Sequence, residues 1–277
     1  MASSTNLGTR LKRIFFTREA PVAMLLSAVM LTLFAGALEH RRQRLAALEP
    51  VAEPIRVFPD FGSYAEVDAK KQMFLDFMEL YIDRQNERVL QTRQRLLVLS
   101  EVVAGGATLS DDDNADLIEI ADRYFLDHGE MSVPDVLQEL LKRVDTIPTA
   151  LALAQAANES AWGTSRFTIE ANNIFGQWCY DEGCGLVPLR RRANASHEVR
   201  AFDSVEAAVR AYFMNLNTHD QYENFREMRH QMRIQRGRLD PLVLAYGLEG
   251  YSERGQHYVD LVQTIIKQNN LVEKYSS

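Results

Sequence analysis

Residues 151–180 read LALAQAANESAWGTSRFTIEANNIFGQWCY, and this stretch decides the fold. Between Leu151 and Ala157 every residue except Gln155 is Ala or Leu, a composition typical of a helix that packs closely on several sides. The helix ends near Glu159, where packing alone does not require a carboxyl group. Small and aromatic residues and a polar turn follow, and they predict that the helix stops there.

Glu159 is the candidate proton donor. Beside the ring of Trp162 in an apolar wall, burial disfavours the charged form of the carboxyl group and raises its pKa. A carboxyl group that stays protonated near neutral pH can give a proton to a leaving oxygen. The alternative is a solvated glutamate on the last turn of a helix.

Amide and aromatic side chains crowd the same segment, and this combination is typical of a sugar site. They are Asn158, Trp162, Asn172, Asn173, Phe175 and Trp178. The rings of Trp162, Phe175 and Trp178 offer flat apolar faces to sugar rings, although each ring alone fits core packing equally well. Asn158 and Asn173 are candidate hydrogen-bonding partners of a substrate, and the alternative for Asn173 is to brace the turn.

The motif QAANESAWGTSRF…NNIFGQW is followed by four others in order. They are CGLVP at Cys184–Pro188, HEVRAF at His197–Phe202, NLNTH at Asn215–His219 and GYSERGQHYV at Gly250–Val259. Together, over about residues 147–271, they resemble the glucosaminidase family of peptidoglycan hydrolases, which includes flagellar muramidases and bacterial autolysins. The whole chain is similar to membrane-anchored members of the Bax type. The resemblance implies a lysozyme-like fold and cleavage of a β-1,4 bond next to N-acetylglucosamine.

The resemblance also implies roles for single residues. Glu159, on the ES-x-WG motif, matches the family's catalytic glutamate. Tyr251 corresponds to a family tyrosine near the last helix, whose hydroxyl group positions the substrate's acetamido group or holds the carbohydrate; the alternative is a core tyrosine.

A second carboxylate is expected in the β lobe, and Glu198 is the first candidate. Alternation along His197–Phe202 places Glu198, Arg200 and Phe202 on one face of the return strand. The other candidates are Asp181, Glu182 and Asp203. The hairpin has Arg190, Arg191 and Arg192 where the family has acidic residues, so the substrate's own acetamido group is an alternative nucleophile.

The charge and motif content of the sequence exclude some classes of partner and ligand. The chain has 277 residues, with 31 Lys and Arg against 38 Asp and Glu, giving a formal charge of −7. The first 38 residues carry four of the basic side chains and one acid, so the remainder is more acidic still. Such a surface repels polyanions, which argues against nucleic acid as a partner. No P-loop, dinucleotide motif or metal-ligand cluster occurs in the sequence, so neither a cofactor nor a metal is expected.

The N-terminal part predicts a single membrane anchor. Residues 20–38 are 19 residues without a charge, just enough to cross a hydrocarbon core of about 30 Å. Basic side chains within residues 1–19 favour a cytoplasmic N-terminus and a domain that faces the periplasm. The triplet Ala35-Gly36-Ala37 would instead fit a cleaved signal, and a buried core helix is a further alternative. Residues 39–63, with three prolines in Leu48–Gly62, predict a spacer.

Residues 64–145 predict a helical accessory region rather than a second catalytic unit. Apolar residues recur at helical spacing from about Tyr64 to Ser100, with a break expected near Asn86. Gly105-Gly106 ends this helix. Ser110 begins a second helix that runs to about His128, and Ser132-Val133-Pro134 begins a third that runs to about Val144.

Residues 146–277 predict a mostly α, α+β catalytic domain with a β-hairpin lobe over one side of a cleft. After the helix of Glu159 and a turn at Thr164–Glu170, the segment Ile174–Phe202 has the composition of a β-hairpin. Four helices follow, at about Ser204–His219, Gln221–Arg236, Pro241–Gly247 and Arg254–Asn269. Cys179 and Cys184 are expected to form a disulfide in an exported domain; in a cytosolic protein the pair would suggest metal or redox chemistry.

Four arginines share one face of the helix at Gln221–Arg236. They are Arg226, Arg229, Arg233 and Arg236. A solvated face is one interpretation, and contact with peptide-stem carboxylates or anionic lipid headgroups is the other.

The function expected from the resemblance is a membrane-anchored endo-β-N-acetylglucosaminidase that cleaves peptidoglycan with Glu159 as general acid. The alternatives are a muramidase or lytic transglycosylase, and a non-hydrolytic protein that binds the cell wall.

Overall fold

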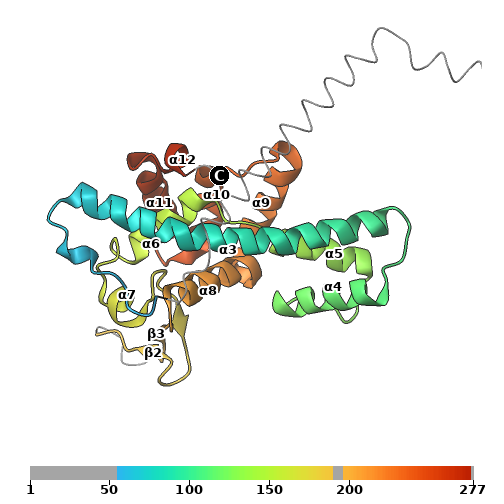
Figure 1. The fold of residues 1–277 in the computed structure, drawn as a ribbon, viewed down its shortest axis with the longest axis horizontal. Helices are drawn as coiled ribbons and strands as arrows, with labels where there is room; N and C mark the ends of the chain where they lie inside the picture. The colour runs from blue at the N-terminus through green and yellow to red at the C-terminus, as the bar shows by residue number, and fades with distance from the viewer. Residues whose placement is uncertain (1–54, 190–195, 276–277) are drawn as a thin grey trace, which may run out of the picture. The chain divides into compact units, whose positions relative to one another are not determined.

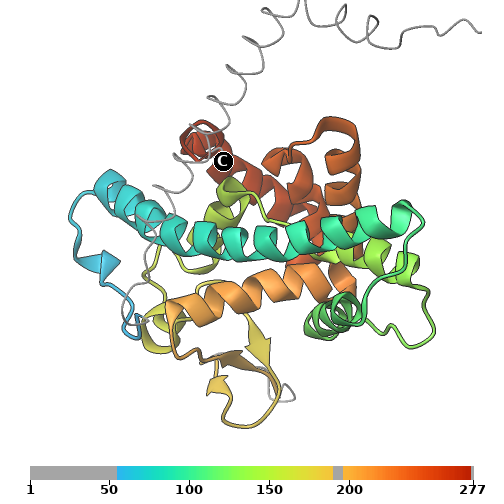
Figure 2. The same cartoon turned by 45° about the vertical axis from the view of Figure 1, so that its right-hand side comes forward.

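Helix α3, Val67–Ala104, is the longest element, and the other helices and the sheet are arranged around it (Figures 1 and 2). The computed structural model describes residues 55–189 and 196–275. The break expected near Asn86 is wrong, because α3 is continuous over 38 residues. Asn86 is buried, donates a hydrogen bond to the Ile147 carbonyl (2.9 Å) and accepts one from the Ile147 amide (3.0 Å). It therefore joins α3 to the chain just before the helix of Glu159.

Helices α4, Asp111–Arg123, and α5, Val133–Arg143, complete the first half. Both begin where the sequence predicts, because the hydroxyl groups of Ser110 and Ser132 cap their first turns. Helix α4 ends five residues before the predicted His128. The chain leaves the helix at Phe125, whose φ is +51°.

Helix α6, Thr149–Glu159, carries the decisive segment and lies at the centre of the molecule. Its residues 149–157 are all buried, as the Ala and Leu composition predicts. It packs against α3 on one side and α11, Gln256–Gln268, on another. The remaining helices are α7 (Arg166–Ala171), α8 (Val205–Thr218), α9 (Glu223–Arg236), α10 (Pro241–Leu244) and α12 (Leu271–Lys274). Short 3₁₀ helices occupy Phe61–Ser63, Asp220–Tyr222 and Ala245–Tyr251.

The β lobe is a three-stranded antiparallel sheet rather than a simple hairpin. Its strands are β1 (Trp178–Cys179), β2 (Gly185–Leu186) and β3 (Glu198–Arg200), and β3 lies between the other two. Gly185 is needed for the pairing, since a Cβ atom there would lie 1.9 Å from the Val199 carbonyl oxygen. The predicted mostly helical α+β class is therefore confirmed, with one strand more than expected.

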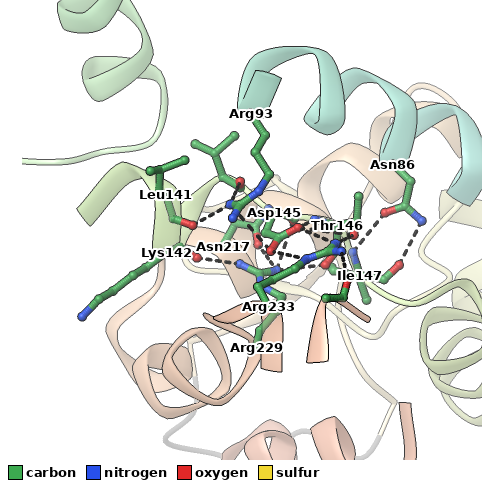
Figure 3. Close-up of polar contacts among 12 residues, drawn as sticks. Asn86, Arg93, Leu141, Lys142, Asp145, Thr146, Ile147, Asn217, Arg229 and Arg233 are labelled. Atoms are coloured by element: carbon green, nitrogen blue, oxygen red, sulfur yellow. Dashed lines mark hydrogen bonds and ion pairs between the residues drawn. The ribbon is translucent and has the colours of Figure 1, made fainter. Parts of the chain in front are cut away.

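Asp145, between α5 and α6, is the centre of a buried polar cluster (Figure 3). Arg233 of α9 binds its two carboxylate oxygens at 2.9 and 3.0 Å, and Arg93 of α3 lies 3.6 Å away. Arg229 donates to the Asp145 carbonyl and, from the same guanidinium group, to the carbonyls of Lys142 and Arg143 that end α5. The cluster ties α3, α5 and α9 to the start of α6.

Both interpretations of the arginine face on α9 are wrong for Arg226 and Arg229, whereas Arg233, whose side chain is 27% exposed, pairs with Asp145. Arg229 is fully buried and Arg226 is 3% exposed, so neither is solvated or open to a ligand. Arg226 donates to the carbonyls of Leu216 and His219 at the end of α8. The two side chains neutralise helix C-termini from inside the protein. The side chain of Arg236 lies outside the described part of the structure.

Of the N-terminal segments predicted above, only the last part of the spacer lies within the described residues. Phe58 and Phe61 are 3% exposed and pack edge-to-face on other rings, Phe61 on Phe74 of α3. Residues 55–63 therefore belong to the folded unit, and the spacer predicted for 39–63 is shorter at that end. The anchor predicted at residues 20–38 lies outside the described residues. Within 55–189 and 196–275, no helix combines the length and apolarity that a membrane span requires.

Candidate active site

A cleft of about 2130 Å³ runs along one face of α8. Arg210, Met214 and Thr218 repeat every four residues along that face and line the cleft. The β lobe contributes Trp178, and the first half of the chain contributes residues of α3 and the turn after α4. Figures 1 and 2 both show the β lobe and α4 on the same side of α3, and in Figure 1 they lie toward its opposite ends.

Glu159 is the last residue of α6, and its side chain lines the cleft. The helix stops sharply because Ala161, Trp162 and Gly163 all have positive φ. The Ser160 hydroxyl group holds this turn, since it donates to the Ala156 carbonyl (2.6 Å) and accepts from the Gly163 amide (2.8 Å). The ES-x-WG motif is thus a strained helix end that presents the glutamate.

The environment of Glu159 favours the protonated acid. Burial raises the pKa of this carboxyl group above its ordinary value. Hydrogen bonds from Tyr258 and Asn158 and the positive charge of Arg254 act in the opposite direction and do not offset the burial. The predicted rise is therefore confirmed, but the apolar surroundings do not come from Trp162.

Trp162, within the strained turn, packs against α3. Its ring packs edge-to-face on Phe74 of α3, at 6.1 Å between centroids, and the Lys71 ammonium group lies over it at 5.1 Å. Trp162 is absent from the described residues that line the cleft, and so is Asn158. Asn158 instead donates to a Glu159 carboxylate oxygen at 3.0 Å. Of these two predicted substrate contacts, one packs in the core and the other holds the acid.

A buried hydrogen-bond chain ends on Glu159, and the sequence analysis missed it. The Tyr212 hydroxyl group donates to Gln155 Oε1 (2.6 Å), and Gln155 Nε2 donates to the Tyr258 hydroxyl oxygen (2.9 Å). Tyr258 in turn bonds to the Glu159 carboxylate. Because Tyr258 accepts from Gln155, its own proton points at Glu159. The signal was available, since Gln155 is the one polar residue in the Ala/Leu run.

Tyr251 and Phe175 form the wall beside Glu159. The Tyr251 hydroxyl group donates to the Phe175 carbonyl at 2.7 Å, and burial keeps the pKa of this phenol well above its ordinary value. Tyr251 lines the cleft, and its hydroxyl oxygen keeps the capacity to accept a hydrogen bond. Phe175 lines the cleft but is 1% exposed and stacks on Tyr212 at 3.9 Å between centroids. The ring of Phe175 therefore shapes the wall more than it offers a stacking face.

Trp178 is the exposed aromatic platform of the cleft. Its ring is 52% exposed and is stacked on the imidazole of His197, with centroids 4.0 Å apart and planes at 13°. Asn173, by contrast, braces the turn: it donates to the Gln177 and Arg200 carbonyls (2.8 and 2.7 Å) and accepts from the Gln177 amide (3.0 Å). It is 1% exposed, which leaves it no face toward a substrate.

Glu198 occupies a different environment from the one that strand alternation predicts. Its carboxylate accepts hydrogen bonds from the Gly183 amide (3.2 Å) and the Gly185 amide (2.8 Å) and is absent from the described residues that line the cleft. His197, just before the strand, and Arg200, at its end, do line the cleft. The alternative carboxylates Asp181, Glu182 and Asp203 are exposed and likewise absent from that lining.

The predicted disulfide between Cys179 and Cys184 is confirmed, with 6.2 Å between the Cα atoms. It closes the loop that contains Gly183, and Gly185, the other amide donor to Glu198, follows it directly. Cys179, Cys184 and Glu198 are also the group of possible metal ligands found within the described residues. Because both sulfur atoms are bonded to each other, the group does not offer a metal its thiolates.

Comparison with known proteins finds one sequence family and one relative that match this chain. The sequence family described as mannosyl-glycoprotein endo-beta-N-acetylglucosaminidase matches residues 135–271. Protein bax of Escherichia coli (strain K12) is 32% identical over 211 residues, which are 76% of this chain and 74% of that protein. No solved structure gives a significant match. The matched range begins within α5 and includes each side chain described above around Glu159.

Proposed function

Because the chain belongs to the glucosaminidase family, a family of glycoside hydrolases, we propose that it cleaves peptidoglycan as an endo-β-N-acetylglucosaminidase with Glu159 as general acid. The observation that carries the proposal is the carboxyl group of Glu159 at the cleft, whose pKa is raised by burial. Its surroundings are buried and its closest partners, Tyr258 and Asn158, are neutral. Such a carboxyl group can protonate the glycosidic oxygen as the bond to it breaks.

For the group that meets the sugar carbon, the proposal takes the substrate's own 2-acetamido oxygen rather than Glu198. The carboxylate of Glu198 is already held by two backbone amides. In this route the acetamido oxygen bonds to the anomeric carbon while the leaving oxygen takes the proton of Glu159. Water then opens the ring intermediate and gives its proton back to the Glu159 carboxylate.

Tyr251 is suited to orient that acetamido group. Tyr251 lines the cleft and its proton is committed to the Phe175 carbonyl, so its oxygen is left to accept from the acetamido N–H group. With the N–H group fixed there, the acetamido carbonyl oxygen is turned toward the anomeric carbon. Trp178, stacked on His197, offers the flat face on which a neighbouring sugar ring can lie.

The choice between Glu198 and the acetamido group is testable by Glu198→Gln. If the substrate supplies the nucleophile, the variant should keep kcat within about tenfold of wild type, since only the support of the loop is weakened. Measuring both kcat and the thermal midpoint separates the two effects. If the variant has normal thermal stability but kcat falls by a factor of about 10³ or more, Glu198 is the second catalytic carboxylate.

The proposal also places the protein in the inner membrane, through the apolar segment at residues 20–38, with the cleft in the periplasm. The confirmed disulfide fits an oxidising compartment. Cell fractionation tests this directly: the full-length chain should remain with the membranes. A shortened chain beginning near Leu38 in the soluble periplasmic fraction would instead establish a cleaved signal.

The experiment that tests the proposed activity is mass spectrometry of fragments released from purified peptidoglycan by the purified protein. The expected products end in reducing N-acetylglucosamine. Products ending in N-acetylmuramic acid would identify a muramidase, and anhydro products a lytic transglycosylase. Binding to the wall without release of fragments would identify a non-hydrolytic protein.

A further inference from the structure

One wall of the cleft carries a concentration of arginine that the catalytic residues do not use. The cleft-lining residues of α3 to α5 and of α8 include four arginines and one acidic side chain, Glu206. The arginines are Arg88, Arg123, Arg143 and Arg210. The whole chain has a formal charge of −7, so this wall has the opposite sign to the protein as a whole.

Three of the four guanidinium groups are open to a ligand. The side chains of Arg88 and Arg123 are 53% and 51% exposed although each has one carboxylate partner, Glu206 at 2.5 Å and Glu119, respectively. Arg210 is exposed and forms no ion pair with a described residue. Since a guanidinium group has five N–H donors in a planar fork, one partner leaves donors for another carboxylate.

Phe125 lies in the same wall and is held in an unfavourable state. It is 74% exposed, lines the cleft and has a φ of +51°. It follows the end of α4, where a left-handed residue is usually glycine. Its carbonyl accepts a hydrogen bond from Arg143 at 3.0 Å, which fixes the strained turn. A bulky exposed side chain in this conformation indicates a function for the ring that outweighs the strain.

We propose that Arg88, Arg123, Arg210 and Phe125 bind the acidic peptide stem of the peptidoglycan whose glycan is cleaved at Glu159. The inference rests on the proposed function and specifies its substrate. The wall and Glu159 line one continuous cleft, so a ligand on the wall belongs to the same polymer as the cleaved sugar. The stem provides both the carboxylates that guanidinium groups bind in pairs and apolar side chains that a phenyl ring can cover.

The test compares two substrates with the full chain. One is a glycan strand that carries its peptide stems, and the other is the same strand after an amidase has removed them. The double variant Arg123→Gln/Arg210→Gln should lose about tenfold or more in kcat/KM, through KM, on the peptide-bearing strand. On the stripped strand it should stay within about twofold of wild type. Arg238→Gln, an exposed arginine absent from the described cleft lining, is the matched control and should change neither.

Phe125→Gly provides a second measurement that does not depend on charge. Glycine relieves the left-handed strain, so the thermal midpoint should rise by about 2–4 °C while kcat/KM on the peptide-bearing strand falls. An equal loss on both substrates would overturn the inference, because the wall would then bind the glycan or its lactyl carboxylate. No loss on either would also overturn it. If wild type cleaves neither strand, the proposed function itself fails, which is a different result.

Discussion

Two buried carboxyl groups, one in the loop before α6 and one at the end of that helix, have opposite charge environments. Asp145 precedes the helix, is 1% exposed and is surrounded by Arg93, Arg229 and Arg233. Glu159 ends the helix, and its hydrogen-bond donors are the neutral Tyr258 and Asn158. Burial alone would raise the pKa of both carboxyl groups. At Asp145 the three arginines outweigh burial and the pKa is lowered, whereas at Glu159 burial prevails.

The difference teaches that burial alone does not make an acid catalyst. A buried carboxylate balanced by arginines is a fixed anion that holds helices together. A buried carboxyl group without a close cation has a raised pKa, which favours the protonated form that can transfer a proton. The structural anion therefore lies in the loop before α6 and the proton donor at the last residue of α6, and each variant below alters one side of this comparison.

The largest effect is expected for Glu159→Gln. The amide has the same shape but no transferable proton, so kcat should fall by a factor of about 10²–10⁴ or more while substrate binding persists. Release of soluble fragments from peptidoglycan measures the rate. Glu253→Gln, at another carboxylate that lines the cleft, is the matched control and should stay close to wild type. Normal turnover by Glu159→Gln would remove the proposed mechanism.

Asp145→Asn should lower stability rather than catalytic chemistry. Removing the negative charge leaves three arginines facing one another in the interior, so the free energy of unfolding should drop by about 3–5 kcal/mol. Urea denaturation measures it. Asp116→Asn, which breaks a surface pair with Arg95, should change it by about 1 kcal/mol or less. A loss at Asp145 as small as that at Asp116 would mean that the cluster is not a structural anchor.

These two regions also differ in how far the sequence predicts them. The helix of Glu159 follows from the Ala/Leu run, the starts of α4 and α5 follow from Ser110 and Ser132, and the Cys179–Cys184 bridge follows from spacing and an exported location. Each depends on neighbours in the chain. Local sequence patterns therefore predict the elements that present Glu159.

The Asp145 cluster could not be predicted, because its partners come from helices far apart in sequence. Arg229 and Arg233 repeat at helical spacing among charged residues, a pattern that indicates a solvated face. Only the packing of α9 against α5 buries Arg229 and brings Arg233 to Asp145. Glu198 shows the same limit, since alternation predicts a face but cannot show that loop amides bind its carboxylate.

The two carboxyl groups should respond to pH in opposite ways. The lowered pKa of Asp145 adds stability that is present above the ordinary aspartate pKa of about 3.9 and is lost as the pH falls through the folded value. The raised pKa of Glu159 subtracts stability above the ordinary glutamate pKa. Glu159→Gln should therefore unfold at pH 7 with a free energy equal to or above that of wild type. Asp145→Asn should lose less stability between pH 5 and pH 2 than wild type does. Identical acid profiles for Asp145→Asn and wild type would contradict this account.

The smallest and most specific effect is expected for Tyr258→Phe. Tyr258 donates to Glu159 and thereby lowers the pKa of this carboxyl group, in opposition to burial. Without the hydroxyl group the pKa of Glu159 rises further, and because the acid acts in its protonated form, the alkaline limb of the kcat/KM profile should move to higher pH. Gln155 and Tyr212 lie behind Tyr258 and remain in place, so kcat at the optimum should fall by less than about tenfold. Tyr222→Phe, at another tyrosine that lines the cleft, should leave the limb where it is. A uniform loss of rate at every pH, with an unmoved limb, would show that Tyr258 supports the fold and does not tune the acid.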